Sequence, residues 1–180
     1  APKMQEHGAS ASTFSDWWGY KYEVREAIPY NAALLWEQGV NTGINSDDAE
    51  MSRRLNQEAA KTVKYGGVPP EEAWKMVTLN PARMLHLDHR MGSVEPGKDA
   101  DLVLWDGNPL AISSRAHMTL VDGAVLYDQE RDARLRKAMM EERERLVQKM
   151  IAAKQAGAST RKAGHAEKGF WHCDSEGEMP

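Results

Sequence analysis

The first half of the chain alternates short β-prone stretches with helix-prone stretches, and this alternation constrains the fold more than any other feature. Residues 8–14 and 40–45 are small or β-tolerant and predict two short strands. Pro29 can open a helix after the first strand, and Gly39 can end it. Residues 51–65 place an apolar side chain at every fourth position and predict a second helix. The repetition predicts an α/β fold with parallel strands.

The second half of the chain changes to an antiparallel β pattern. Residues 69–72 predict one more helix start, with prolines and acids in its first turn. Strands are expected at residues 100–105, 118–121 and 124–127. The dipeptide Asp122-Gly123 separates the last two strands and is typical of two-residue hairpins. We therefore expect a small antiparallel sheet after the α/β part.

The C-terminal quarter of the chain is strongly charged. Residues 129–156 have only a thin apolar stripe and predict a surface helix, which could also serve assembly. The Gly-, Ser- and Lys-rich residues 157–180 predict a flexible tail. The whole chain has a net charge of −4 and no long apolar run. This argues against nucleic-acid partners, which want a basic face, and against a membrane span.

The cysteine content and the first residues bear on the compartment. The lone Cys173 excludes an intrachain disulfide and a zinc site made of several cysteines. The sequence starts without Met and shows no basic-then-apolar export pattern, and we expect it to be part of a longer protein. A soluble protein is expected, whether cytoplasmic or periplasmic and secreted, so the compartment stays open.

Two segments are specific enough to suggest a family. The first, Thr78–Leu85, reads TLNPARML, and its Asn80-Pro81 is expected to interrupt a helix. The second, residues 91–105, reads MGSVEPGKDADLVLW, with Gly92 and Gly97 permitting tight turns before a buried strand. Together they resemble the C-terminal end of the amidohydrolase superfamily, particularly its imidazolonepropionase-like and prolidase-like branches.

The resemblance extends over residues 8–128 and implies an architecture. Residues 1–88 would be the last two βα units of a (β/α)8 TIM-type barrel, whose chemistry lies at the C-terminal ends of the strands. Residues 89–128 would be the C-terminal strands of a composite β-sandwich. Residues 129–156 would then form the charged C-terminal helix, and residues 157–180 the flexible tail.

The resemblance also implies one catalytic residue. Residues 8–14 would be strand seven and residues 40–46 strand eight, so that Asp47 matches the family's aspartate. That residue binds a divalent metal, with zinc expected here, and takes a proton from the attacking water. From the local pattern alone, Asp47 with Glu50 three residues later is a capping box at a helix start. Asp48 is the alternative site residue, because either acid could cap the helix while the other faces the site.

Substrate contacts are expected from the same end of the barrel. Asn45 and Ser46 precede the aspartate and could touch the substrate. Trp17 and Trp18 belong to the loop after the first strand, where aromatic side chains can line a pocket. Simple packing is an equally good interpretation of these tryptophans.

The histidines are not expected to bind the metal. His7 precedes the first strand, and His86 and His89 lie in the turn toward the sheet. The run His172-Cys173-Asp174 resembles a ligand set, but three adjacent residues cannot close a tetrahedral site alone.

The implied activity is hydrolysis of carbon–nitrogen bonds in cyclic amides, ureas or dipeptides by metal-activated water. The family's His-x-His does not occur in the sequence, and a complete barrel takes about 250 residues. The chain alone is therefore expected to be inactive and to need the remaining barrel half or another chain, besides a small-molecule substrate. A homo-oligomer joined through open strand edges is also conceivable. Two alternatives remain: a non-catalytic subunit that completes a split barrel, and a small ligand-binding module.

Overall fold

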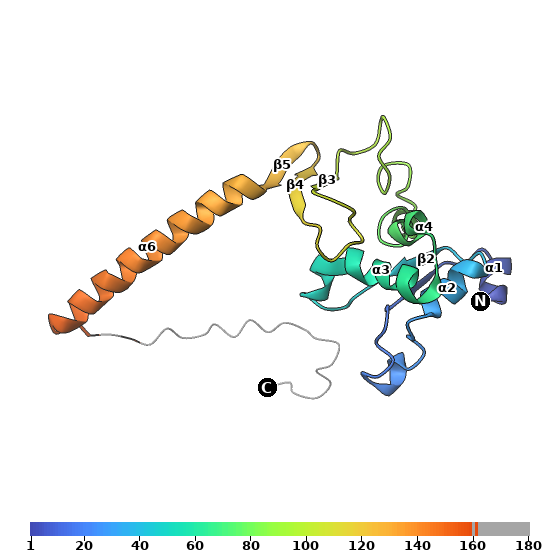
Figure 1. Cartoon of the computed structure of the whole chain (residues 1–180), viewed down its shortest axis with the longest axis horizontal. Coiled ribbons are helices and arrows are strands. Elements are labelled where there is room, and N and C mark those ends of the chain that lie inside the picture. The colour runs from blue at the N-terminus through green and yellow to red at the C-terminus, as the bar shows by residue number, and fades with distance from the viewer. Residues whose placement is uncertain (160, 162–180) are drawn as a thin grey trace. The chain divides into compact units, whose positions relative to one another are not determined.

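The computed structural model describes residues 1–159 and 161 (Figure 1). The chain divides into two compact units, residues 1–133 and residues 134–180. The first unit begins with a series of short helices and two strands: α1 (Pro2–Glu6), β1 (Ala11–Thr13), the 3-10 helix η1 (Tyr22–Val24), α2 (Asn31–Glu37), β2 (Thr42–Ile44), the 3-10 helix η2 (Met51–Arg54), α3 (Leu55–Gly66), α4 (Pro70–Lys75) and α5 (Leu79–Met84).

The two strands β1 and β2 form a parallel pair with a helix between them in sequence. Ala11 lies opposite Thr42, and Thr13 lies opposite Ile44. A parallel pair requires a crossover connection, and α2 lies within it. The α/β class predicted from the alternation of strands and helices is confirmed.

Helices cover β2. All three residues of the strand are buried, and Ile44 belongs to an apolar core with residues of α2, of α4 and of the segments next to α4: Ala32, Ala33, Val68, Ala73 and Met76. Gly66, at the end of α3, lies directly against Ala33, where a Cβ would come within 2.2 Å of the alanine Cβ. This glycine lets α3 approach α2 closely.

Three further strands form an antiparallel sheet in the order β3 (Leu102–Trp105), β4 (Ala116–Val121) and β5 (Ala124–Asp128). Asp122 and Gly123 join β4 to β5 with φ angles of 48° and 77°. Two consecutive left-handed residues are typical of a type I′ hairpin turn. The hairpin predicted at this dipeptide is confirmed.

A single helix, α6 (Gln129–Gln155), follows β5 and continues into the second unit. It has no buried residue, in agreement with the surface helix predicted from its charge. Within the described part of the chain, no helix combines the length and apolar character that crossing a membrane requires.

The structure corrects the expectations for local structure at three places. The strand expected over residues 8–14 is confined to Ala11–Thr13, and the short helix α1 before it was not predicted. Asn80-Pro81 does not interrupt a helix but lies within α5. Proline is tolerated in the first turn of a helix, because the amide it lacks has no partner there. The break falls earlier, at residues 76–78 between α4 and α5.

Candidate functional site

The segment that leaves the C-terminal end of β2 holds the predicted site residues. The backbone amide of Asn45 donates to the carbonyl of Thr13 at 3.1 Å, which continues the strand pairing by one residue. The side-chain oxygen of Asn45 is buried and has no hydrogen-bond partner among the described residues. Ser46 is also buried, whereas Asp47 is exposed. The backbone therefore reaches the protein surface at Asp47.

The two adjacent aspartates have different roles in the local structure. The Oδ1 atom of Asp48 accepts hydrogen bonds from the amides of Glu50 at 2.9 Å and Met51 at 2.8 Å. This carboxylate therefore caps the turn that leads into η2. Asp47 has a φ angle of 49°, a left-handed conformation that Asp tolerates better than most residues. The capping role that the local pattern offered to Asp47 falls to Asp48, and a metal role for Asp47 stays a prediction.

Residues 76–80 hold β2 in place through two hydrogen bonds. The Asn80 side-chain amide is buried and donates to the Thr42 carbonyl at 2.8 Å. The backbone amide of Ile44 donates to the Met76 carbonyl at 3.0 Å. Asn80 thus anchors the strand that precedes the segment of Asn45, Ser46 and Asp47. Sequence reasoning used this asparagine as part of a signature and missed its contact, for which a polar residue in the first turn of a helix was the only signal.

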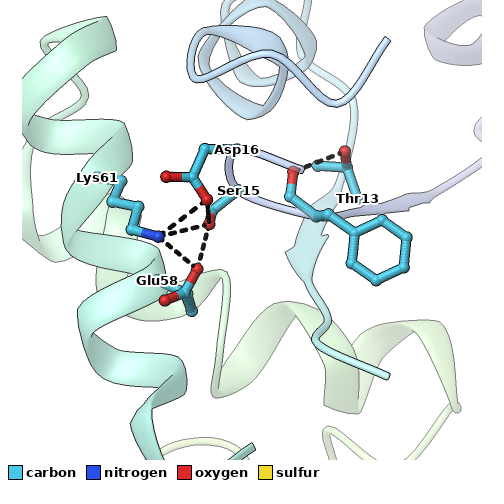
Figure 2. A network of polar contacts seen from close by, with 6 residues as sticks. Thr13, Ser15, Asp16, Glu58 and Lys61 are labelled. Carbon is cyan, nitrogen blue, oxygen red and sulfur yellow. Dashed lines mark hydrogen bonds and ion pairs between the residues drawn. The ribbon is translucent and has the colours of Figure 1, made fainter. Parts of the chain in front are cut away.

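A polar network links the loop after β1 to α3, and sequence reasoning missed it. Figure 2 shows the side chains of Ser15, Asp16, Glu58 and Lys61 pointing toward one another. The Lys61 ammonium lies 2.8 Å from Glu58 Oε2 and 2.9 Å from Asp16 Oδ1. The hydroxyl of Ser15 donates to Glu58, and both residues are buried.

The electrostatics of this network favour the charged lysine. Burial by itself would lower the pKa of Lys61, but hydrogen bonds to Glu58 and Asp16, and the charges of these carboxylates, outweigh it and raise the pKa. The hydrogen bond between Ser15 and Glu58 could not be predicted from the sequence, because the two residues are 43 positions apart. The network fixes the loop after β1, in which the tryptophans lie.

The two tryptophans of this loop differ in their surroundings. Trp17 stacks on Phe14 with ring centroids 4.4 Å apart and meets the edge of Tyr20 at 5.5 Å. Trp18 is 56% exposed. The ring contacts of Trp17 support the interpretation that it packs within the loop. A substrate role for either tryptophan stays a prediction.

The histidines that the structure describes belong to no metal-binding group. His7, His86 and His89 are exposed. Within residues 1–159 and 161, no three side chains of His, Cys, Asp or Glu are grouped in a way that could hold a metal ion. The run His172-Cys173-Asp174 lies outside the described residues.

Comparison with known proteins identifies the family. Residues 30–129 match the amidohydrolase family, and this chain belongs to that family. The resemblance inferred from the two motif segments is confirmed. The chain is similar to the amidohydrolase tasK of Hapsidospora irregularis, with 33% identity over 116 residues, and to the imidazolonepropionase of Thermoplasma volcanium, with 37% identity over 87 residues.

A solved structure gives the same result. The chain is similar to the crystal structure of an amidohydrolase from Thermotoga maritima, with a TM-score of 0.61 and 30% sequence identity. The match covers 71% of this chain and 34% of that one. The matches to the Hapsidospora and Thermoplasma relatives cover 64% and 47% of this chain, but only 12% and 21% of the relatives. The chain therefore spans a minor part of the proteins it matches.

Proposed function

We propose that this chain forms the C-terminal part of a metal-dependent hydrolase that cleaves carbon–nitrogen bonds outside ordinary internal peptides. Cyclic amides, ureas and dipeptides are the proposed substrate classes. Family membership and the similarity to an imidazolonepropionase support the proposal. The observation on which it rests most is the position of Asp47, an exposed carboxylate three residues after the end of β2, whose neighbour Asp48 accepts the capping bonds.

The proposed architecture is the last two βα units of a (β/α)8 barrel. On this assignment β1 and β2 are strands seven and eight, and their parallel pairing agrees with it. Catalytic residues of such barrels lie at the C-terminal ends of the strands. Asn45, Ser46 and Asp47 follow the C-terminal end of β2, and Trp17 and Trp18 lie in the loop after β1. The sheet of β3, β4 and β5 would be the C-terminal part of the composite sandwich.

The residues present fit a metal site only as one contributor to it. The Asp47 carboxylate is exposed, and oxygen ligands of this kind suit zinc and other divalent ions. The side-chain oxygen of Asn45, two residues earlier, is buried and has no partner among the residues that the structure describes. A buried polar atom without a partner is costly unless a further group satisfies it. The other ligands would come from sequence upstream in the barrel or from another chain.

The proposed chemistry assigns one proton transfer to this chain. When bound, a zinc-type ion lowers the pKa of water to near 7 and polarises the scissile carbonyl. A carboxylate oxygen of Asp47 accepts the proton of the attacking water and then delivers it to the leaving nitrogen, so that one residue is base and then acid. Asn45 and Ser46 would orient the substrate beside this carboxylate, and Trp17 and Trp18 would line its apolar side.

The proposal is tested by comparing the 180-residue chain with the same chain extended by the sequence that precedes it in its gene. Each is purified, desalted, analysed for zinc, and assayed with a cyclic amide, urea and a dipeptide. We expect zinc retention and turnover only in the extended protein, because one carboxylate cannot hold the ion. Turnover by the chain alone, abolished by Asp47→Asn, would contradict the proposed incompleteness. Metal-free turnover by the extended protein would contradict the metal mechanism.

A further inference from the structure

The helix α6 presents apolar side chains to solvent. Seven of them are between 38% and 70% exposed: Leu135, Met139, Met140, Leu146, Val147, Met150 and Ile151. Most helices in proteins are stabilised by packing an apolar face. A helix of this length with exposed methionines and aliphatic side chains therefore calls for a covering surface. The family match ends at residue 129, where α6 begins, so the proposed hydrolase function does not explain this face.

Over residues 139–150, part of this apolar set follows a seven-residue repeat, whereas Leu135 and Ile151 lie outside its two core positions. Met139 and Leu146 are seven residues apart and occupy one position of the repeat. Arg143 and Met150 are seven residues apart and occupy the adjacent core position. A repeat of this kind is the pattern by which two helices pack together along a seam. The presence of Arg143 at the seam restricts the direction in which a second α6 can lie.

A parallel pair would place Arg143 against Arg143 of the other copy in one core layer, where the like charges repel. An antiparallel pair can instead place Arg143 beside Leu146 of the other copy and Met139 beside Met150. The long stem of arginine can cover the leucine while its charged end reaches water. The antiparallel direction thus removes the unfavourable contact and keeps the apolar contacts.

The flanks of the seam are complementary in this antiparallel register. On one flank, Glu142 comes opposite Lys149 of the second copy, and the two-fold symmetry repeats the pair. On the other flank, Met140 comes opposite Val147, again twice. Glu142 and Lys149 are both exposed in the chain. Glu142 already accepts two hydrogen bonds from Arg145 of its own helix, each 2.6 Å long, and these lower the pKa of its carboxyl group.

We propose that α6 is a self-association surface that pairs antiparallel with α6 of a second copy of this chain, with Arg143 packed on Leu146 and Glu142 opposite Lys149. The proposal does not depend on the hydrolase activity. It makes the chain a homodimer through a segment that lies outside the amidohydrolase match.

Charge reversal tests the register directly. The dissociation constant of the dimer is measured by sedimentation equilibrium for the 180-residue chain and for Glu142→Lys, Lys149→Glu and the double variant. Each single reversal puts like charges opposite each other twice and should weaken the dimer about tenfold. The double variant restores opposite charges and should return to within about twofold of the original constant. Lys137→Glu, a reversal of equal size on the outer face, is the matched control and should leave the constant unchanged.

Cysteine cross-linking tests the direction independently of affinity. In a Cys173→Ser background, Met139→Cys together with Met150→Cys should yield a disulfide-linked dimer under mild oxidation. Met139→Cys alone should not, because residue 139 faces residue 150. Cross-linking by the single variant would overturn the antiparallel proposal in favour of a parallel pair. Two results would overturn the proposed surface altogether: a chain that stays monomeric at all concentrations, or a dimer whose dissociation constant does not change with either charge reversal. Another part of the protein or lipid would then cover α6.

Discussion

The strands β2 and β3 show that apolar sequence and burial are separate properties in this chain. β2 reads Thr-Gly-Ile and contains one large apolar residue, yet all three residues are buried. β3 reads Leu-Val-Leu-Trp and is entirely apolar, yet none of its residues is buried. Val103 and Leu104 are 44% and 46% exposed. What packs on a strand decides its burial, and the composition of the strand only permits it.

The surroundings of the two strands explain the difference. β2 has β1 along one side, a hydrogen bond from Ile44 to Met76 on the other, and α2, α3 and α5 near it. The sheet of β3, β4 and β5 keeps apolar side chains exposed, such as Leu126 at 63%. On the proposed architecture, further strands of the composite sandwich would cover this exposed sheet. The two regions should therefore respond differently to the same kind of mutation.

Two glycines offer the sharpest test of this difference. A Cβ on Gly66 would lie 2.2 Å from the Cβ of Ala33, and one on Gly107 would lie 2.8 Å from the hydroxyl of Ser114. Gly66→Ala should lower the free energy of unfolding by about 3 kcal/mol, because two backbone-anchored atoms in a packed core must separate. Gly107→Ala should cost well under about 1 kcal/mol, because the Ser114 side chain can rotate away. Chemical denaturation measures both; equal costs would remove the distinction between the regions.

Two asparagines allow the buried and the exposed region to be compared by the cost of losing a side-chain hydrogen bond. The buried Asn80 amide donates to the Thr42 carbonyl, whereas the exposed Asn108 side chain accepts a bond from the Leu110 amide. Asn80→Ala should destabilise the chain by about 2 kcal/mol, since a buried carbonyl loses its partner. Asn108→Ala should cost about 0.5 kcal/mol, since water can replace the bond. Thermal unfolding of the two variants checks the order, and a larger cost at Asn108 would contradict it.

The Lys61 network predicts a dependence on pH. The folded-state pKa of Lys61 lies above its ordinary value of 10.5, so folding favours the charged form. The resulting stabilisation is complete below pH 10.5 and is lost as pH rises through the higher folded-state pKa. Lys61→Met should cost about 1 kcal/mol at pH 7, because the ion pairs are only partly shielded from water.

The measurement is the difference in unfolding free energy between the original chain and the Lys61→Met variant at several pH values. The difference should stay constant from neutral pH to about pH 10 and shrink above it. Lys137→Met is the control, because the Lys137 side chain is 81% exposed and lies 4.0 Å from Glu141. A difference that grows with rising pH would contradict the assigned direction of the pKa.

Short-range sequence patterns predicted much of the fold, but they did not predict contacts between residues far apart in the sequence. The hairpin at Asp122-Gly123 could be predicted because its turn depends on the left-handed backbone angles that these two residues adopt. The α/β class could also be predicted from local patterns, because strands and helices alternate along the chain. The bond from Asn80 to Thr42 and the pairing of Ser15 with Glu58 join residues 38 and 43 positions apart, and no periodicity encodes them.

The candidate site shows the same limit at closer range. The sequence offered both Asp47 and Asp48 as caps, because either spacing to the following amides is acceptable. In the structure, Asp47 has a left-handed backbone, and it is the carboxylate of Asp48 that accepts the bonds from the amides of Glu50 and Met51. The family resemblance supplied the catalytic role for Asp47, which local geometry alone would not suggest.

Steady-state turnover of the upstream-extended protein carrying either Asp47→Asn or Asp48→Asn tests the central claim most directly. We predict that Asp47→Asn lowers kcat by about 100-fold or more, since the proton acceptor is lost. Asp48→Asn should keep kcat near that of the original protein, since asparagine is also a good cap. Full turnover by Asp47→Asn, or a loss confined to Asp48→Asn, would contradict the assignment of Asp47 to the reaction.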